Sequence, residues 1–137
     1  MKLKRQSTQK PNFKELDKMV RAMEELLLGG DRGLTLEEVY SFQNENGSFA
    51  LFDSTKIPNE AIVDYINTPS CIGTAILMKE YLEGNVKIKD NLVKGLHFIQ
   101  TTGLSGHGYD AEKTRIKCLK IFIKGDLSKF LDREIKL

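Results

Sequence analysis

Six consecutive residues combine the side-chain types that acid–base and nucleophilic chemistry needs. They bring a hydroxyl, an imidazole, a phenol and a carboxylate together with two glycines: Ser105, Gly106, His107, Gly108, Tyr109 and Asp110. Glycine lets a backbone approach a ligand closely, and a loop before a helix can offer N–H groups to an anion. We predict that any ligand site of the chain lies in this loop, with His107 at its centre because an imidazole ordinarily titrates near neutrality.

The competing interpretation of the same loop is structural. Asp110 stands just before a predicted helix, where an aspartate usually caps the helix and does not act as a base. The segment also lacks the lysine–serine pair of a phosphate-binding loop and the glycine spacing of a dinucleotide fingerprint. Both interpretations remain open at the level of sequence.

A second candidate site is a row of four lysines on one predicted helix. Lys113, Lys117, Lys120 and Lys124 follow the spacing i, i+4, i+7 and i+11, which places them on one helix face. Such a face can bind phosphates, but it is also what the wet side of an amphipathic helix looks like. Because no stacking aromatics are interleaved with the lysines, nucleic acid is not the expected partner.

The remaining reactive side chains predict neither a metal site nor a cofactor. The chain has two histidines and two cysteines, and neither Cys71 nor Cys118 belongs to a CxxC pair. Each cysteine stands in an apolar stretch, so both are expected to be buried free thiols. His97 lies beside an apolar helix face and is expected in the core or at its boundary. No pair of carboxylates is placed for shared-proton chemistry, so the sequence does not support a two-carboxylate mechanism.

Composition places the chain among ordinary globular proteins. It has 137 residues, 40% of them hydrophobic and 29% charged, with a formal net charge of +2. The charge alone implies no polyanionic partner. The longest strongly apolar run, 71–78, is too short to span a membrane, and the basic N-terminus is not followed by the apolar segment of a signal peptide. We therefore expect a cytoplasmic protein with a disordered basic tail at 1–11 and one α-helical domain at 12–137.

Apolar spacing and helix signals predict five or six helices. An amphipathic helix is expected from Asn12 to Gly29, and a second begins at Thr35 with a capping box to Glu38. Thr68, whose hydroxyl is expected to act as a cap, is followed by Pro69 and predicts the start of a helix over 69–83. That helix is apolar on nearly all sides, which is typical of a central buried helix.

Further helices are expected after Asp90, which should act as a cap, and over 111–124. A last short helix is expected after Asp126. A short extended stretch, with a β-like pairing, is expected at 48–52.

Two segments of the chain look like copies of one unit. In each, an amphipathic helix ends near a glutamine, and a glycine turn with an aromatic residue follows: Gln43 with Gly47 and Phe49, and Gln100 with 106–109. The two glutamines are 57 positions apart, a period consistent with helical-hairpin repeats. We expect the glycine to take a left-handed conformation, the aromatic to fold back over the joint, and the glutamine to bond carbonyls of the preceding turn.

This pattern resembles the repeats of terpenoid (squalene) cyclases and protein prenyltransferase β-subunits, over about residues 33–124. The resemblance implies an all-α, partial α/α-toroid-like architecture of helical hairpins. The acidic D-x-D-D motif of the cyclases and the Asp-x-Cys part of the prenyltransferase zinc site are absent. We therefore predict a non-catalytic helical repeat module that binds a protein partner or associates with itself. The alternative is a protein that binds a small or isoprenoid-like ligand in a cleft near residues 106–110.

Overall fold

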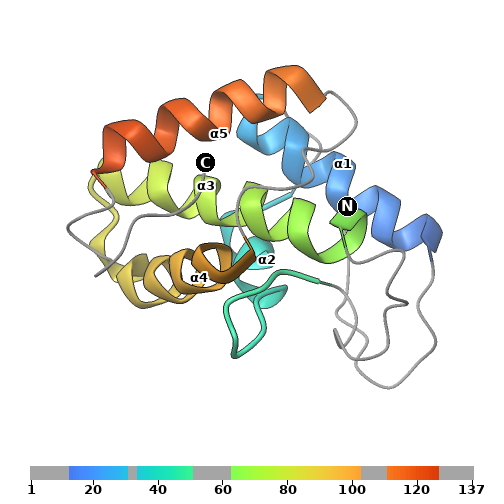
Figure 1. Ribbon diagram of the computed structural model, residues 1–137, viewed down its shortest axis with the longest axis horizontal. Coiled ribbons are helices and arrows are strands. Elements are labelled where there is room, and N and C mark those ends of the chain that lie inside the picture. Colours follow the sequence, from blue (N-terminus) through green and yellow to red (C-terminus); the bar gives the residue numbers. More distant parts are fainter. Residues whose placement is uncertain (1–12, 31–33, 51–62, 103–110, 127–137) are drawn as a thin grey trace.

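The computed structural model describes residues 13–30, 34–50, 63–102 and 111–126, and these form an all-α fold, as predicted (Figure 1). The α-helices are α1 (Phe13–Leu27), α2 (Leu36–Ser41), α3 (Thr68–Leu82), α4 (Lys89–Thr102) and α5 (Ala111–Gly125). A π-helical turn, η3 (Val63–Asn67), leads into α3, and a 3-10 turn, η4 (Val86–Ile88), leads into α4. No helix in the described part of the chain is long and apolar enough to cross a membrane.

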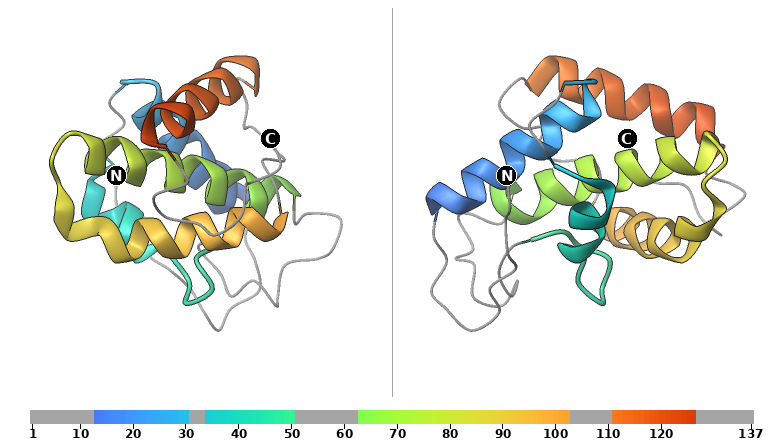
Figure 2. Two further views of the ribbon diagram at one scale, coloured as in Figure 1. Left: turned by 60° about the vertical axis from the view of Figure 1, so that its left-hand side comes forward. Right: turned by 180° about the vertical axis from the view of Figure 1, so that it is seen from behind.

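Helix α3 is the centre of the fold, which confirms the prediction of a core helix. Its first eleven residues, from Thr68 to Met78, are all buried. Helices α1, α4 and α5 pack around it, with α4 and α5 on opposite sides (Figures 1 and 2). Each large aliphatic side chain that is fully buried in this way contributes about 1.5–3 kcal/mol to folding. The apolar circumference of α3 is thus explained by neighbours on all its sides.

Two predicted helix caps are wrong for the same physical reason. Thr68 does not cap α3, because the N-cap position belongs to Asn67, and the π-helical turn already runs into the helix. Asp90 lies inside the first turn of α4, because the 3-10 turn delivers a helical backbone to Lys89. A helix that grows out of an earlier turn has fewer open N–H groups for a side chain to cap. By contrast, the capping box of α2 is confirmed: Glu38 N–H donates to Thr35 Oγ1 at 3.2 Å.

The helices approach α3 closely where one partner is a glycine. A Cβ atom added to Gly95 of α4 would run into Thr74 Oγ1, whose hydroxyl donates to Ser70 O at 2.7 Å. A Cβ atom added to Gly125, at the end of α5, would lie 2.5 Å from Met78 Sδ. The absence of a side chain therefore lets α4 and α5 press against α3 from opposite sides.

The turn after α2 fits its predicted role in two of three respects. Gly47 has φ +92, and the Phe49 side chain is fully buried. The backbone N–H of Gln43 bonds Tyr40 O of its own helix, but the side-chain amide reaches other carbonyls. Its amide donates to Gly47 O at 3.3 Å and to Asn91 O of α4 at 2.9 Å, and its oxygen accepts from Asn91 Nδ2 at 2.8 Å. The Gln43 side chain therefore links the turn to α4. The backbone of Gly47 also lies in close contact with that helix, because a Cβ atom added to Gly47 would collide with Lys94 O.

The predicted extended stretch after this turn is reduced to a single antiparallel bridge between Gln43 and Phe49 within the described residues. Phe49 N–H donates a hydrogen bond to Ser70 Oγ of α3 at 2.9 Å. The second predicted repeat unit depends on a glycine loop that lies outside the described residues. The predicted basic tail and the predicted last short helix also lie outside the described residues. The resemblance to toroid repeats therefore stays a prediction.

Candidate functional site

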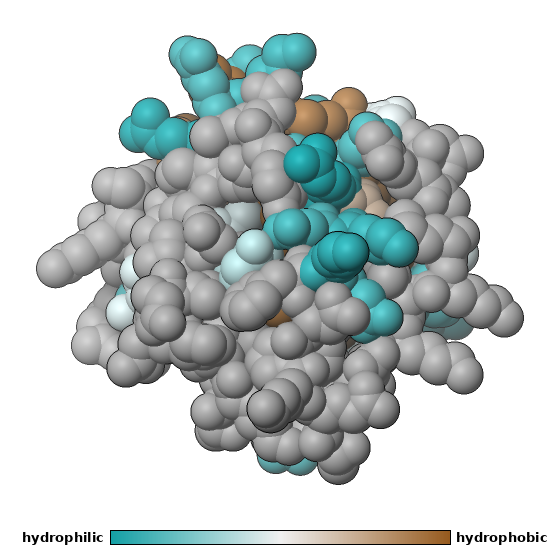
Figure 3. All heavy atoms as spheres, turned by 90° about the vertical axis from the view of Figure 1, so that its right-hand side faces the viewer, coloured by the Kyte–Doolittle hydropathy of each residue, from teal (hydrophilic) through white to brown (hydrophobic). Residues whose placement is uncertain are grey.

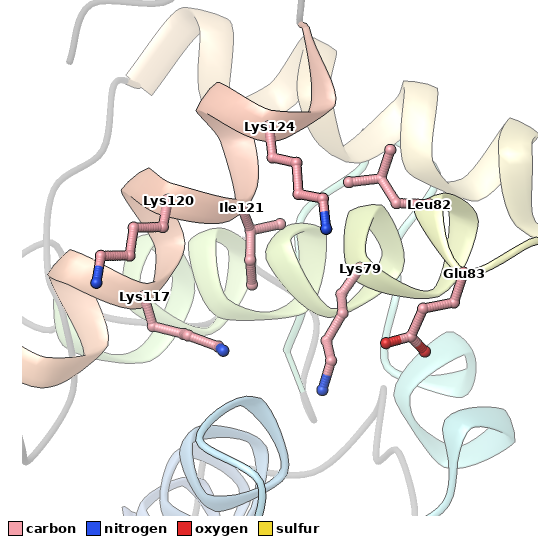
Figure 4. Close-up of a pocket in the computed structure, with 7 residues that line it drawn as sticks. All are labelled: Lys79, Leu82, Glu83, Lys117, Lys120, Ile121 and Lys124. Carbon is pink, nitrogen blue, oxygen red and sulfur yellow. The ribbon is translucent and has the colours of Figure 1, made fainter.

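The predicted ligand loop, residues 105–110, lies outside the described residues. The predicted lysine face is described, and it forms part of a pocket between α3 and α5. The pocket has a volume of about 230 Å³. Its lining comes from the last turns of α3 and from α5: Lys79, Leu82, Glu83, Lys117, Lys120, Ile121 and Lys124 (Figure 4). We call this the lysine groove.

Helix α5 presents its lysines to the groove because its opposite side is occupied. Cys118 and Phe122 are buried against the core, and the lysines at 117, 120 and 124 fall roughly a third to half of a turn away from them. Ile121 lies between the two faces, with 8% of its surface exposed, and forms part of the apolar floor of the groove. The sequence predicted this face correctly, but Lys113 does not line the groove.

The fourth lysine of the groove, Lys79, comes from α3 and has no counterpart in the sequence pattern. Figure 4 shows Lys117 pointing from α5 toward Lys79, whereas Lys120 points the other way. Lys79 is 38 positions before Lys117 in the chain, so only the packing of α5 on α3 brings them together. Its signal in the sequence is a single charge at the end of an apolar run, which by itself indicates the exposed end of a buried helix.

The charge of the groove is not neutralised by neighbouring side chains. Four lysines line it together with one carboxylate, Glu83. Among the described residues, none of these four lysine side chains forms a hydrogen bond or an ion pair. Ammonium groups gathered in this way attract anions, and the attraction weakens as salt screens it. The arrangement can therefore bind an acidic group above an apolar floor.

The interior beneath α5 contains a polar contact that could not be predicted from the sequence. Thr114 Oγ1 donates to Glu24 Oε2 at 2.6 Å, and both residues are buried. This bond joins α1 to α5 across 90 positions of sequence, so no local pattern could have indicated it. Burying a carboxylate is costly without hydrogen bonds, and the contact helps to fix where α5 lies.

The two cysteines are buried and free, as predicted. Cys118 of α5 is hydrogen-bonded to Cys71 of α3, and this contact, followed by burial, raises the pKa of the Cys118 thiol far above its ordinary value. The thiolate is the reactive form of cysteine. Cys118 is therefore unsuited to act as a nucleophile.

The described residues support neither a functional role for His97 nor a metal site. His97 is exposed on α4, so the prediction of a core or boundary histidine is wrong; the apolar face of α4 ends one position away, at the buried Leu96. No cluster of three potential metal ligands occurs within residues 13–30, 34–50, 63–102 and 111–126.

On the face shown in Figure 3, the described residues are mainly hydrophilic, with apolar atoms in small areas. The two most exposed large apolar side chains are Val86, with 67% of its surface exposed, and Ile123, with 71%. They belong to η4 and to the last turns of α5. These segments lie on the left of Figure 1, at the opposite end of the molecule from the face in Figure 3.

Comparisons of the chain with known protein families, with curated proteins and with solved structures found no significant match.

Proposed function

We propose that this chain is a non-catalytic helical module that binds an acidic segment of a protein partner in the lysine groove. The observation that carries the proposal is the set of four lysine side chains from two helices, none of them paired, around the apolar side chains of Leu82 and Ile121. A cationic rim speeds association and selects acidic partners, and an apolar centre supplies the contact area that holds them.

The size of the groove favours protein side chains over a complete small molecule. Pockets for small ligands usually have volumes of about 300–1,000 Å³, and the groove has about 230 Å³. Shallow pockets of this kind commonly receive single anchor side chains of a protein partner. An isoprenoid-like ligand near residues 106–110 remains the alternative proposal; that loop is outside the described residues.

The positions of two potentially reactive side chains support a non-catalytic function. Cys118, the buried thiol beneath α5, has a raised pKa and is shielded from solvent. His97 stands alone on an exposed helix face, with no potential metal-ligand cluster in the described part of the chain. Nucleophilic catalysis requires an activated nucleophile beside a base, and neither residue supplies that arrangement.

Self-association is a second candidate function, and a different surface supports it. Val86 and Ile123 are largely exposed, and apolar side chains in that position gain free energy when an interface covers them. The lysine groove is unsuited to a symmetric dimer, because a two-fold interface through it would bring like charges together. Native mass spectrometry at high micromolar concentration tests this: the Val86→Ser and Ile123→Ser variants should shift a dimer to monomer, and a monomeric native protein would contradict it.

The test of the acidic-partner proposal is a binding titration with short poly-L-glutamate. We expect the native protein to bind it at low ionic strength and to lose affinity as salt is added. Replacing Lys79, Lys117, Lys120 and Lys124 with glutamine should weaken binding at least ten-fold.

The matched control replaces four exposed lysines outside the groove with glutamine: Lys18, Lys87, Lys89 and Lys94. This variant has the same net charge as the groove variant. Equal losses of affinity in the two variants would show that only total charge matters and would contradict a site in the groove.

A further inference from the structure

A second pocket adjoins the lysine groove and shares one residue with it. It has a volume of about 170 Å³ and lies where α1, the start of α2 and α3 meet. Its lining residues are Leu26, Leu27, Leu36, Ile76, Lys79 and Glu80. Because Lys79 lines both pockets, a single bound segment can reach from one to the other along α3.

The chemistry of the two pockets differs. Four aliphatic side chains line the second pocket with only one ammonium and one carboxylate, whereas the groove has four ammonium groups. Leu26 and Leu36 are only partly buried, and both pack on the hydrophobic core. Covering them would remove further apolar surface from water, which favours binding by about 25 cal/mol per Å². The second pocket therefore suits one aliphatic side chain.

We propose that the segment bound in the lysine groove is an acidic amphipathic helix whose aliphatic anchor side chain occupies the second pocket. This inference rests on the proposed function, since it specifies the partner of the same site. Lys79 stands at the junction and bonds an acidic residue next to the anchor. The two pockets together bind one face of the helix. Its carboxylates lie toward α5, and its anchor side chain lies toward α1 and α2.

The spacing of the α5 lysines favours a helical occupant over an extended one. Lys117, Lys120 and Lys124 are separated by three and four residues on one helix, a span of about 10 Å. Carboxylates at i, i+3 and i+7 of a bound helix lie on one face with the same repeat. Side chains of an extended strand alternate between faces, so half of them would point away from the lysines.

A nucleic acid fits the site less well. Its phosphates would satisfy the lysines, but single-stranded nucleic acids are usually held by aromatic side chains that stack on the bases. No aromatic residue is among the described residues that line the two pockets, and the four aliphatic side chains of the second pocket have no apolar partner in a phosphate backbone. We therefore assign the two pockets to a helix of a protein partner.

The test uses two labelled synthetic peptides in a fluorescence anisotropy titration with the full chain. Both are helical and carry glutamates at i, i+3 and i+7; one has a leucine at the anchor position and the other has alanine. We expect the leucine peptide to bind about ten-fold more tightly, the typical effect of one anchor side chain. In the Leu36→Trp variant, where the indole fills the second pocket, the two peptides should bind equally.

Leu28→Trp is the control variant, because Leu28 is 38% exposed and lines neither pocket. It should keep the ten-fold preference, and circular dichroism should show that both tryptophan variants remain folded. Equal binding of the two peptides to the native protein would overturn the anchor while leaving the acidic-partner function intact. If neither peptide binds, both proposals fail.

An oligonucleotide serves as competitor. Displacement of the leucine peptide by oligo-dT at equal charge concentration, unchanged by Leu36→Trp, would overturn the inference in favour of a general polyanion site. Failure of oligo-dT to displace the peptide, at a salt concentration where the peptide stays bound, supports it.

Discussion

The turn after α2 and the lysine groove are both rich in polar side chains, yet they use them in opposite ways. In the turn, the side chains of Gln43, Asn44 and Ser48 are all hydrogen-bonded within the protein. In the groove, four ammonium groups have no side-chain partner among the described residues. Polar groups that are paired internally specify a structure, whereas unpaired exposed charges are available to a ligand. The difference separates residues that stabilise the fold from the residues to which we assign binding in our proposal.

The largest effect should follow from adding a methyl group to the turn. In Gly47→Ala the new Cβ would collide with Lys94 O, and the backbone has φ +92. The collision comes in addition to the cost of a positive φ, so we expect a loss of about 3 kcal/mol or more in the free energy of unfolding. Urea denaturation followed by circular dichroism measures it.

The matched control for this change is Gly84→Ala. Gly84 has φ +109 but open space around the position of its Cβ. It should cost only about 1–2 kcal/mol, which is the price of the backbone conformation alone. Equal losses in the two variants would mean that the turn is not packed tightly against α4.

A smaller loss is expected when the glutamine of the turn loses its amide. Gln43→Met keeps the length of the side chain but removes its hydrogen bonds to Gly47 and Asn91. We expect a loss of about 1–3 kcal/mol, because the partners on α4 are left unsatisfied. A double-mutant cycle with Asn91→Ala should give a coupling energy above about 0.5 kcal/mol. Additive effects would show that Gln43 does not join the turn to α4.

Both regions contrast with the interior beneath the groove, whose thiols give a dependence on pH. Folding raises the pKa of Cys118, so the unfolded chain ionises this thiol at lower pH than the native protein does. Above about pH 8.5 the unfolded state therefore gains stability relative to the native state, and the free energy of unfolding falls by up to about 1.4 kcal/mol per pH unit. The stability that the raised pKa of Cys118 contributes is fully present below that pH.

Denaturation at pH 8 and pH 9.5 measures this slope. The Cys118→Ala variant should have a shallower slope than the native protein, because it lacks the titrating group. Identical slopes would contradict a raised pKa at Cys118.

The smallest effect on stability is expected in the groove itself. Lys120→Gln and Lys124→Gln should change the free energy of unfolding by less than about 0.5 kcal/mol each, as is usual for exposed side chains without internal partners. Thermal denaturation at low salt measures the change. A loss as large as that of Gln43→Met would mean that these lysines stabilise the fold, and the contrast between the two regions would disappear.

Much of the fold was predictable because it depends on local patterns. The all-round apolar character of 69–83 identified α3, and the capping box at Thr35 identified the start of α2. The caps at Thr68 and Asp90 were wrong because a turn preceding each helix supplied what a cap would have supplied. Short-range signals predict that a helix exists better than they predict where it begins.

The candidate site was predictable only in part, for a different reason. The face formed by Lys117, Lys120 and Lys124 follows from helical spacing alone. Lys79 and the buried contact between Glu24 and Thr114 depend on the packing of distant segments. The exposed position of His97 was missed because its immediate neighbour, Leu96, belongs to the buried face of α4.

The central claim is that binding takes place in the lysine groove and not at the turn. An NMR titration of the ¹⁵N-labelled protein with short poly-L-glutamate tests it most directly. We expect amide shifts along α5 and the end of α3, around Leu82 and Ile121, with those at 43–49 unchanged. Shifts spread evenly over all lysine-bearing helices, or centred on the turn, would contradict it.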